Sequence, residues 1–295
     1  MEPCLDGLSQ NQKERLAFVE FRAYFLGEVR RTDVINRFGI ATAAATRDLA
    51  LYRQISNDNI VLDQRTKSYL AVKDFKPVFD HPAERVLSAL SQGFGEGIGG
   101  QSKPLIQSET PRFLSQPDVS VLAPITQAIN RKKVARIAYY SFSSGKTERE
   151  IVPFALVNNG LRWHVRAFDR RREQFLDFVL TRIESSVLLE DAQIKEHEDP
   201  SHDIQWSRIV ELELVPHPKE KHKAIIAMDY GMSAKELLLK VRVRAALAGY
   251  FLRLWSVDCS NDHGLEGKEV RLWLRNPLSL YGVESSGLAP GYAEA

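Results

Sequence analysis

Three basic side chains alternate along one short predicted strand, and their spacing suits an anion. Residues 161–168 read LRWHVRAF, and alternate side chains of a strand point to the same face. Arg162, His164 and Arg166 therefore share one face, each about 7 Å from the next. Two guanidinium groups beside an imidazole offer several N–H donors to a phosphate, which predicts an anion-binding face. A solvated strand face is the alternative, and composition alone leaves the two interpretations even.

Neighbouring residues could extend this basic face. The segment that ends at 181–183 supplies Arg182 as a third cation, and the hydroxyl groups of Tyr139 and Ser141 are further candidate donors. The opposite face of the strand is predicted to be core, because it carries Leu161, Trp163, Val165 and Ala167.

A second set of candidate residues belongs to the segment 31–49, RTDVINRFGIATAAATRDL. It has the pattern of two short helices around a tight turn. The outward positions in the N-terminal half of such a second helix meet base edges in a major groove. Here they are Thr42, Ala43, Thr46 and Arg47, and Arg47 could pair with O6 and N7 of guanine. A helical hairpin without a DNA role is the alternative.

The elements that must position these residues follow from periodicity. A first helix is expected over Thr32–Phe38, and Gly39 suits the turn because glycine tolerates positive φ. The second helix is expected over Thr42–Gln54 and would bury Ala45, Leu49 and Tyr52. Residues 59–72 predict a two-stranded wing, whose tip carries Arg65 and Lys67 for phosphate contact.

The whole chain is predicted to be an α+β multidomain protein of 295 residues. We assign residues 1–92 to the winged helix-turn-helix and 93–120, rich in Gly, Ser, Pro and Gln, to a linker. Residues 121–195 open with an amphipathic helix and continue with four short strands, which suggests a small β-barrel. Residues 203–283 suggest a compact α/β sandwich, and 284–295 a disordered tail.

The expected elements of the sandwich alternate along the chain. They are a strand over 204–215, a helix from Pro218 to Tyr230 that ends at Gly231, a strand over 235–243 and a helix over 244–255.

Bulk properties exclude several other classes of protein. A net charge of +2 is too small to indicate nucleic-acid binding by itself, so any basic surface must be local. Cys4 and Cys259 are far apart, which predicts neither a disulfide framework nor a zinc site. We expect a mobile surface thiol at Cys4 and a packing role for Cys259. No apolar run approaches about 18 residues, and the acidic N-terminus does not resemble a signal peptide, so a cytoplasmic protein without membrane contact is expected.

Catalytic patterns are not convincing either. The glycine-rich segment GFGEGIGG lacks the lysine of a phosphate-binding loop, and no nucleophile elbow is present. The acidic segment 190–199 is interpreted as a solvated connector. No enzymatic activity, cofactor or metal is therefore expected.

The segment 137–183 resembles a WYL domain, an Sm/SH3-like β-barrel of bacterial regulators. The residues that carry the resemblance are Tyr139, Gly145, Arg149, Pro153, Trp163-His164-Val165, Arg166, Asp177 and Arg182-Ile183. The triplet is Trp-Tyr-Leu in much of the family, so this chain places a titratable imidazole at its centre.

The flanking segments resemble regulators of the BrxR/CapW type. RFGIATAAATRDLALYRQ with the following wing resembles their winged helix, and WSRIVELELVPHPKEKHKAIIAMDYGM resembles their C-terminal extension. The resemblance implies a transcriptional regulator, usually a repressor, near phage-defence operons such as BREX and CBASS. It also implies a pocket for a nucleotide or nucleic-acid fragment, formed by Ser141, Arg149, His164, Arg166 and Arg182.

The sequence thus predicts a homodimeric repressor of its own phage-defence operon, which binds an inverted-repeat operator in double-stranded DNA and is released by an anionic ligand. The expected dimer contact is the apolar helix that carries Leu247, Tyr250, Phe251 and Leu254. The alternative is a nucleotide- or RNA-binding accessory protein that regulates a defence enzyme complex by protein contact.

Overall fold

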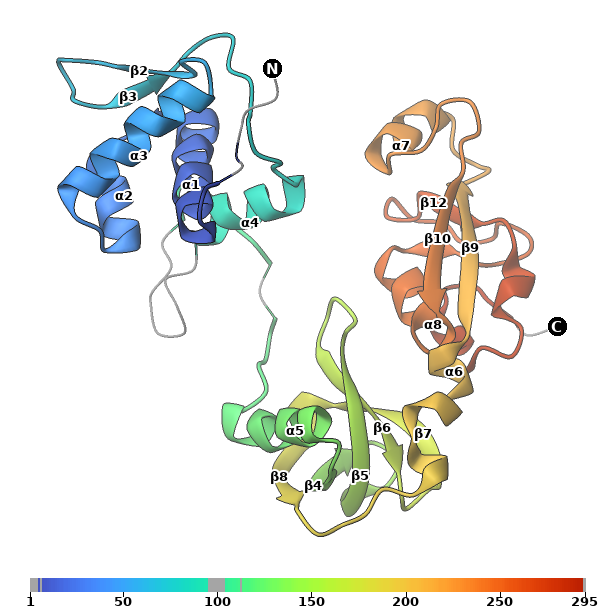
Figure 1. The fold of residues 1–295 in the computed structure, drawn as a ribbon. Coiled ribbons are helices and arrows are strands. Elements are labelled where there is room, and N and C mark those ends of the chain that lie inside the picture. Colours follow the sequence, from blue (N-terminus) through green and yellow to red (C-terminus); the bar gives the residue numbers. More distant parts are fainter. Residues whose placement is uncertain (1–4, 6, 95–103, 112, 294–295) are drawn as a thin grey trace. The chain divides into compact units, whose positions relative to one another are not determined.

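The computed structural model describes residues 5, 7–94, 104–111 and 113–293, and the chain divides into two compact units, residues 1–111 and 112–295 (Figure 1). Each unit is described by itself. Cys4 and residues 95–103 of the predicted linker lie outside the described residues.

The first unit packs helices against a small antiparallel sheet of strand order β1-β3-β2. Its described elements are α1 (Gln10–Leu26), β1 (Glu28–Val29), α2 (Arg31–Phe38), α3 (Thr42–Ile55), β2 (Ile60–Leu62), β3 (Tyr69–Ala71) and α4 (Ala83–Gln92). The two predicted helices and the wing hairpin are present. Strand β1 was not predicted, because two residues are too few to produce a periodic pattern.

The turn between α2 and α3 has the geometry that the sequence predicts. Gly39 adopts φ 62° and its N–H donates to the carbonyl of Ile35 at 2.8 Å, which ends α2. Ala45, Leu49 and Tyr52 are fully buried on the inner face of α3, as expected. The small side chain of Ala45 lets the helices approach closely, so the outer face of α3 is held in a defined orientation.

The WYL-like part of the second unit is a five-stranded antiparallel sheet of order β7-β6-β5-β4-β8. The strands are β4 (Val134–Ser141), β5 (Gly145–Asn158), β6 (Trp163–Asp169), β7 (Gln174–Val179) and β8 (Ile183–Leu189), and α5 (Val119–Arg131) packs against β5 and β8. In the described residues the expected barrel is open, because no ladder joins β7 to β8. The last predicted strand is broken by a 3₁₀ turn at Leu180–Arg182.

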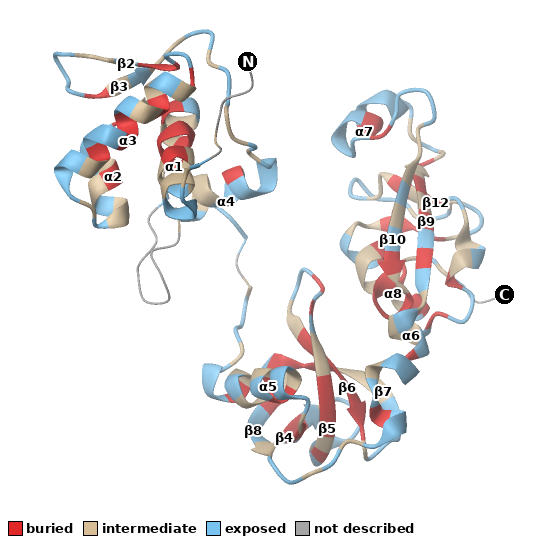
Figure 2. Cartoon of the chain, viewed as in Figure 1, coloured by how far each residue is buried: buried red, intermediate tan, exposed pale blue. Residues whose placement is uncertain are grey.

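The C-terminal part contains a second sheet, of order β10-β9-β12-β11. Its elements are α6 (Ile204–Ser207), β9 (Ile209–Pro216), α7 (Lys223–Asp229), β10 (Leu239–Arg244), α8 (Ala245–Leu254), β11 (Val257–Asp258) and β12 (Leu272–Leu274). Figure 2 shows the buried residues of β9 and α8 that form its core.

Two details of this part differ from the sequence prediction. Residues 204–207 form a helical turn rather than a strand, because the Asp203 side chain caps it by accepting from the N–H of Trp206 at 3.0 Å. Helix α7 begins at Lys223, five residues after Pro218. None of the helices in the described residues is long and apolar enough to cross a membrane.

The prediction of a disordered tail is wrong for residues 284–293. A 3₁₀ helix, Glu284–Leu288, packs against α8, and Ser285 bonds to both the carbonyl of Ala245 and the N–H of Gly249 at 3.0 Å. A Cβ at Gly249 would lie 1.7 Å from the Ser285 carbonyl oxygen, so only glycine fits this approach. The small side chains of residues 284–288 let this segment pack closely on α8, which is why it is ordered despite its composition.

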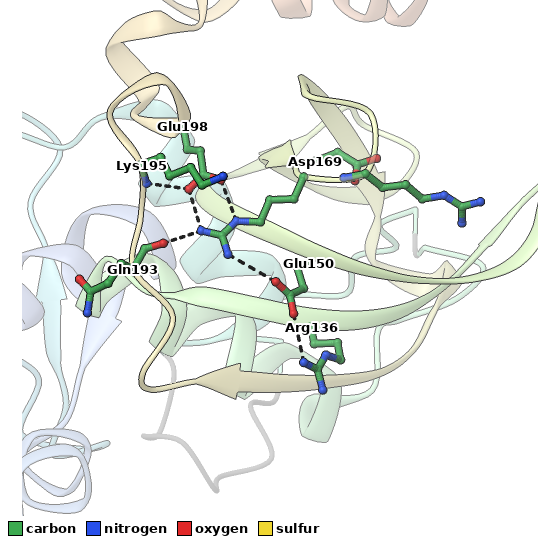
Figure 3. A network of polar contacts seen from close by, with 8 residues as sticks. Arg136, Glu150, Asp169, Gln193, Lys195 and Glu198 are labelled. Carbon is green, nitrogen blue, oxygen red and sulfur yellow. Dashed lines mark hydrogen bonds and ion pairs between the residues drawn. The ribbon is translucent and has the colours of Figure 1, made fainter.

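The connector over 190–199 is anchored rather than wholly solvated, which corrects the sequence interpretation. Glu198 is buried and accepts from Arg170 Nε at 2.7 Å and from the N–H of Lys195 at 2.8 Å. Arg170 also donates to the carbonyl of Gln193, and Glu150 joins the same network (Figure 3). The network fastens the connector to the β5–β6 part of the WYL sheet.

Candidate DNA-binding surface and ligand-sensing face

The outer face of α3 presents the side chains that the sequence assigns to DNA. The four predicted contact residues are all exposed: Thr42, Ala43, Thr46 and Arg47. Among the described residues, Arg47 takes part in no ion pair. The Thr46 hydroxyl donates to the carbonyl of Thr42 at 2.9 Å, so its oxygen acts as an acceptor towards other groups.

Arg31 is a neighbouring cation that the sequence reasoning missed. It is exposed at the first position of α2, and its guanidinium donates to Thr46 Oγ1 at 3.4 Å. The signal that could have found it is the start of the first predicted helix, where the helix crosses the phosphate backbone in this motif. Arg31 therefore joins Arg47 on one surface.

Two buried carboxylates hold α3 in place, and neither was singled out from the sequence. Asp48 is 3% exposed and pairs with Arg15 of α1 at 2.6 Å. Glu20 of α1 is fully buried and accepts from the Tyr52 hydroxyl at 2.8 Å. Burial raises the pKa of Tyr52, so this hydroxyl stays protonated and donates.

Glu20 also fixes the segment that follows the wing. Its carboxylate accepts from the N–H groups of Val78 and Phe79, each at 2.8 Å, and lies 2.9 Å from His81 Nε2. One side chain therefore ties α1 to α3 and to the return from the wing.

The wing presents its two predicted cations at the tip. Arg65 and Lys67 are exposed, and Asp63 shapes the turn by accepting from the N–H of Arg65 at 2.9 Å and from the Thr66 hydroxyl at 2.7 Å. The Thr66 bond and the Arg65 N–H lower the pKa of Asp63, so the turn keeps its carboxylate at neutral pH.

We expect Arg47→Ala to weaken binding to the cognate site by about 1–3 kcal/mol and to relax preference at one base position. The reason is that Arg47 is the long basic side chain among the outward positions in the N-terminal half of α3. Titration of the variant on single-base-substituted operators measures both effects. An affinity equal to that of the parent would remove Arg47 from the base-reading set.

Arg65→Ala and Lys67→Ala should weaken binding to cognate and random DNA alike. Each lost phosphate contact should reduce the log–log salt slope by roughly one per subunit, because fewer counterions are released. Binding isotherms at several salt concentrations give the slope. A change in base preference instead would show that the wing reads a groove.

The basic residues of β6 do not form the open anion-binding face that the sequence predicts. Val165 and Ala167 are buried in the core, as predicted, but the prediction is wrong for Leu161, which precedes β6 and is 58% exposed. Arg166 is also only 3% exposed. It donates to both carboxylate oxygens of Asp203, at 2.8 and 3.1 Å, and lies 3.4 Å from Asp177. Two carboxylates already neutralise Arg166, so it is not an open cation.

Arg149 is likewise paired. It is 5% exposed, its guanidinium is ion-paired with the fully buried Asp169, and its Nε donates to Thr147 at 3.0 Å. Arg149 and Arg166 are therefore not free cations, because the tertiary fold brings carboxylates to them.

His164 is a buried residue of β6, and one of its two ring nitrogens has no hydrogen-bond partner among the described residues. The residue is 4% exposed, and that nitrogen is Nδ1. Burial, with the charges of Arg162 and Arg182, lowers its pKa to about 4, so the imidazole is neutral at pH 7. Its ring lies 5.5 Å from that of Tyr250 on α8.

The remaining predicted residues, Arg182, Tyr139 and Ser141, differ in exposure and in the partners that they contact. Arg182 is half-buried, and its guanidinium lies 4.2 Å from the ring centre of Phe142, which is 93% exposed. Tyr139 is buried, and its hydroxyl accepts from the N–H of Val179 at 3.4 Å. Ser141 bonds to Ser143 on the hairpin tip.

Helix α8 is not a free dimer surface. Leu247 is buried in a cluster with Val157 of β5, and Phe251 packs against the same cluster. The side chain of Leu254 lies against Gly160, since a Cβ there would meet Leu254 at 2.5 Å. Most of the predicted dimer face is therefore used to join the C-terminal part to the WYL sheet.

Comparisons with known proteins agree with this organisation. Three family models match the chain: the BrxR transcriptional regulator winged helix-turn-helix domain over residues 11–92, the WYL domain over 120–188, and the BrxR transcriptional regulator C-terminal dimerization domain over 209–280.

Full-length relatives match as well. A DNA-binding transcriptional repressor CapW of Stenotrophomonas maltophilia is 30% identical over 90% of this chain and 92% of its own. The CapW protein of Pseudomonas aeruginosa is 30% identical over 92% of this chain and 91% of its own. A solved structure of proteasome accessory factor B/C of Arthrobacter aurescens has 19% identity and a TM-score of 0.25, and covers 97% of this chain but 51% of that one. The chain belongs to the BrxR/CapW family of WYL-domain transcriptional regulators.

Proposed function

We propose that this protein is a homodimeric transcriptional repressor that binds specific double-stranded DNA through α3 and the wing. The observation that carries the proposal is the outer face of α3. There, exposed threonines and Arg47, which forms no ion pair within the part of the chain that the structure describes, lie on a helix anchored by Asp48 and Tyr52. Relatives over most of the chain are named DNA-binding transcriptional repressors, and the model matched at 209–280 is that of a dimerization domain.

A dimer predicts the form of the operator. One winged helix contacts too few base pairs to select a site in a genome, so two copies should read an inverted repeat. The half-sites should lie about one or two helical turns apart.

A shift assay tests the proposal on the DNA upstream of the protein's own gene. Tight, salt-sensitive binding is expected, at least about 10³-fold stronger than to a scrambled duplex. Equal binding to both duplexes would instead favour an accessory protein that acts by protein contact.

The second part of the proposal concerns control by a ligand. We propose that a phosphate-bearing nucleotide or nucleic-acid fragment binds the His164 face and releases the repressor from a phage-defence operon that includes its own gene. His164 Nδ1 supports this, because a buried polar atom without a partner is costly unless a ligand or water supplies one. Arg162 and Arg182 contribute positive charge at the same place.

His164→Ala is expected to abolish the response to the inducing signal while leaving operator affinity unchanged within twofold. Reporter output with and without phage infection, together with operator affinity in vitro, measures the two properties separately. A variant that responds as the parent does would exclude this face as the sensor. Val187→Ala, at an exposed position of β8, serves as the control.

The buried imidazole of His164 also leads to a prediction about the pH dependence of stability. The folded pKa of His164 is about 4, below the usual value of 6.5, so the unfolded chain takes up a proton that the folded chain does not. The parent should therefore lose stability as pH falls from about 6.5 towards 4. His164→Gln should lose less over that window in thermal unfolding, and equal losses would contradict a buried neutral imidazole.

A further inference from the structure

Arg166 is paired with more carboxylate groups than one guanidinium needs. Asp177 of β7 lies 3.4 Å from it, and Asp203, which precedes α6, accepts two hydrogen bonds from it at 2.8 and 3.1 Å. Arg166 and Asp203 are each only 3% exposed. One of the two carboxylates could therefore leave, and Arg166 would still have a partner of opposite charge.

Asp203 is the carboxylate that can leave with little rearrangement of the backbone. It is a buried residue in an exposed stretch, since His202 before it and Ile204 after it are both exposed. Asp177 instead belongs to β7, where it is paired with Arg166 in the antiparallel ladder. Rotation of the Asp203 side chain towards solvent would open one side of the guanidinium and would leave Asp177 in place.

The opened guanidinium would share a face with His164. Positions 164 and 166 alternate along β6, so their side chains point to the same side, about 7 Å apart. Nδ1 of His164 has no hydrogen-bond partner among the described residues, and it donates to an oxygen when it carries the ring proton. Tyr250 of α8 links the two positions, because its ring lies 5.5 Å from that of His164 and its hydroxyl bonds to Asp177. An oxyanion placed here would receive hydrogen bonds from both His164 and Arg166.

We propose that Asp203 occupies the place of the ligand's phosphate on Arg166, and that the ligand displaces it with a terminal phosphate monoester. The inference rests on the proposed control by a ligand, and it states how that site is closed and which phosphate opens it. Carboxylates and phosphates both present pairs of oxygens that fit the guanidinium fork.

The charge of the ligand decides the competition with Asp203. A phosphodiester carries a single negative charge, as Asp203 does, but Asp203 is attached to the site by the chain and so has a high effective concentration. A phosphate monoester carries a charge of about −1.5 to −2 at pH 7 and has three acceptor oxygens. Arg162 and Arg182, whose charges act on His164, would add to its attraction. The site should therefore select a monoester over a diester.

Displacement of Asp203 would be felt in the C-terminal part of the chain. Asp203 caps α6 by accepting from the N–H of Trp206 at 3.0 Å. The Trp206 carbonyl accepts from Arg244 at 2.6 Å, and its ring lies 4.5 Å from the same guanidinium. Arg244 is the last residue of β10 and directly precedes α8. Loss of the cap would thus loosen the connection between the WYL sheet and the second sheet.

Titration calorimetry on the full chain tests the proposal with inorganic phosphate and dimethyl phosphate, at a mildly alkaline pH where the first is a dianion. The parent should bind inorganic phosphate at least about tenfold more tightly than dimethyl phosphate. Asp203→Asn should bind inorganic phosphate at least about tenfold more tightly than the parent, because an amide competes less for Arg166. It should also accept dimethyl phosphate, and asparagine still caps α6.

Asp199→Asn is the matched control, since Asp199 is exposed and caps the neighbouring 3₁₀ turn Pro200–His202. Its affinity for phosphate should equal that of the parent. His164→Ala added to Asp203→Asn should remove the increase in affinity, which assigns the increase to this site. Equal phosphate affinity of the parent and Asp203→Asn, or an equal increase in Asp199→Asn, would overturn the proposal. Phosphate binding by none of these proteins would contradict the ligand site itself, and the inference with it.

Hydrogen exchange on the parent tests the displacement without a substitution. Saturating inorganic phosphate should speed the exchange of the Trp206 N–H at least about twofold, because the cap of α6 is lost. Unchanged exchange with phosphate bound would show that Asp203 stays on Arg166. Thymidine 5′-monophosphate and the 5′-phosphorylated thymidine dinucleotide distinguish the two sources of a monoester, a free nucleotide and the end of a DNA fragment. Both should bind more tightly than the dinucleotide without its 5′-phosphate, and equal binding of all three would refute the selection of a monoester.

Discussion

Replacing Arg166 by methionine is expected to destabilise the second unit by about 3–5 kcal/mol, because it leaves buried carboxylates without their cation. Arg166 is 3% exposed and is shared between Asp203, which also caps α6, and Asp177 of β7. Methionine fills similar space but offers no donor, so the desolvation cost of both carboxylates becomes uncompensated.

The loss of stability in Arg166→Met should be largest at neutral pH and smaller at acidic pH. Burial already raises the pKa of Asp177, although the charge of Arg166 opposes the shift. Without Arg166 the folded pKa rises further above the unfolded one, so the destabilisation is full at neutral pH and shrinks as pH falls through the folded pKa. Thermal unfolding of the full chain between pH 4 and 7.5 measures this trend.

Two further variants separate the ion cluster from a general effect of losing arginine. Arg182→Met should change stability by less than about 0.5 kcal/mol, since Arg182 is half-buried and rests on the exposed ring of Phe142. Adding Asp177→Asn and Asp203→Asn to Arg166→Met should recover part of the loss. A stable Arg166→Met single variant would show that the cluster contributes little.

Glu20→Leu is expected to cost the first unit about 3–5 kcal/mol and to remove operator binding with it. The substitution leaves the Tyr52 hydroxyl and the N–H groups of Val78 and Phe79 buried without their acceptor. Since those groups belong to α3 and to the segment after the wing, α3 and the wing should no longer be held in their positions relative to α1.

Glu14→Gln on the same helix is the control, because Glu14 is exposed and bonds to Gln10 at 3.3 Å. Thermal unfolding and operator affinity are measured on both variants. Glu20→Gln should fall between them, since an amide keeps one acceptor oxygen but turns an N–H group towards the remaining donors. Parent-like melting of Glu20→Leu would show that this network does not hold the domain.

Much of the fold could be predicted because its signals are local. The helical period of Val34, Ile35 and Phe38, with Gly39 after it, identifies the helix-turn-helix without tertiary information. The strands of the WYL sheet also follow from alternation and turns. Predictions failed where a distant contact decides the outcome, as at 204–207, where Asp203 caps a helical turn, and at 284–288, which pack on Gly249.

The candidate sites also combine features that the local sequence determines with features that depend on distant contacts. The sequence by itself determined which residues face outward on α3 and at the wing tip, because 3.6-residue periodicity and turn chemistry assign those directions locally. It also identified the face of a strand that carries His164 and Arg166, whereas Arg162 precedes that strand, which begins at Trp163. Only the tertiary structure decided that this face is covered, because Asp203 and α8 come from more than thirty residues further along the chain. Whether a cation is free or neutralised depends on such long-range partners, which strand periodicity cannot report.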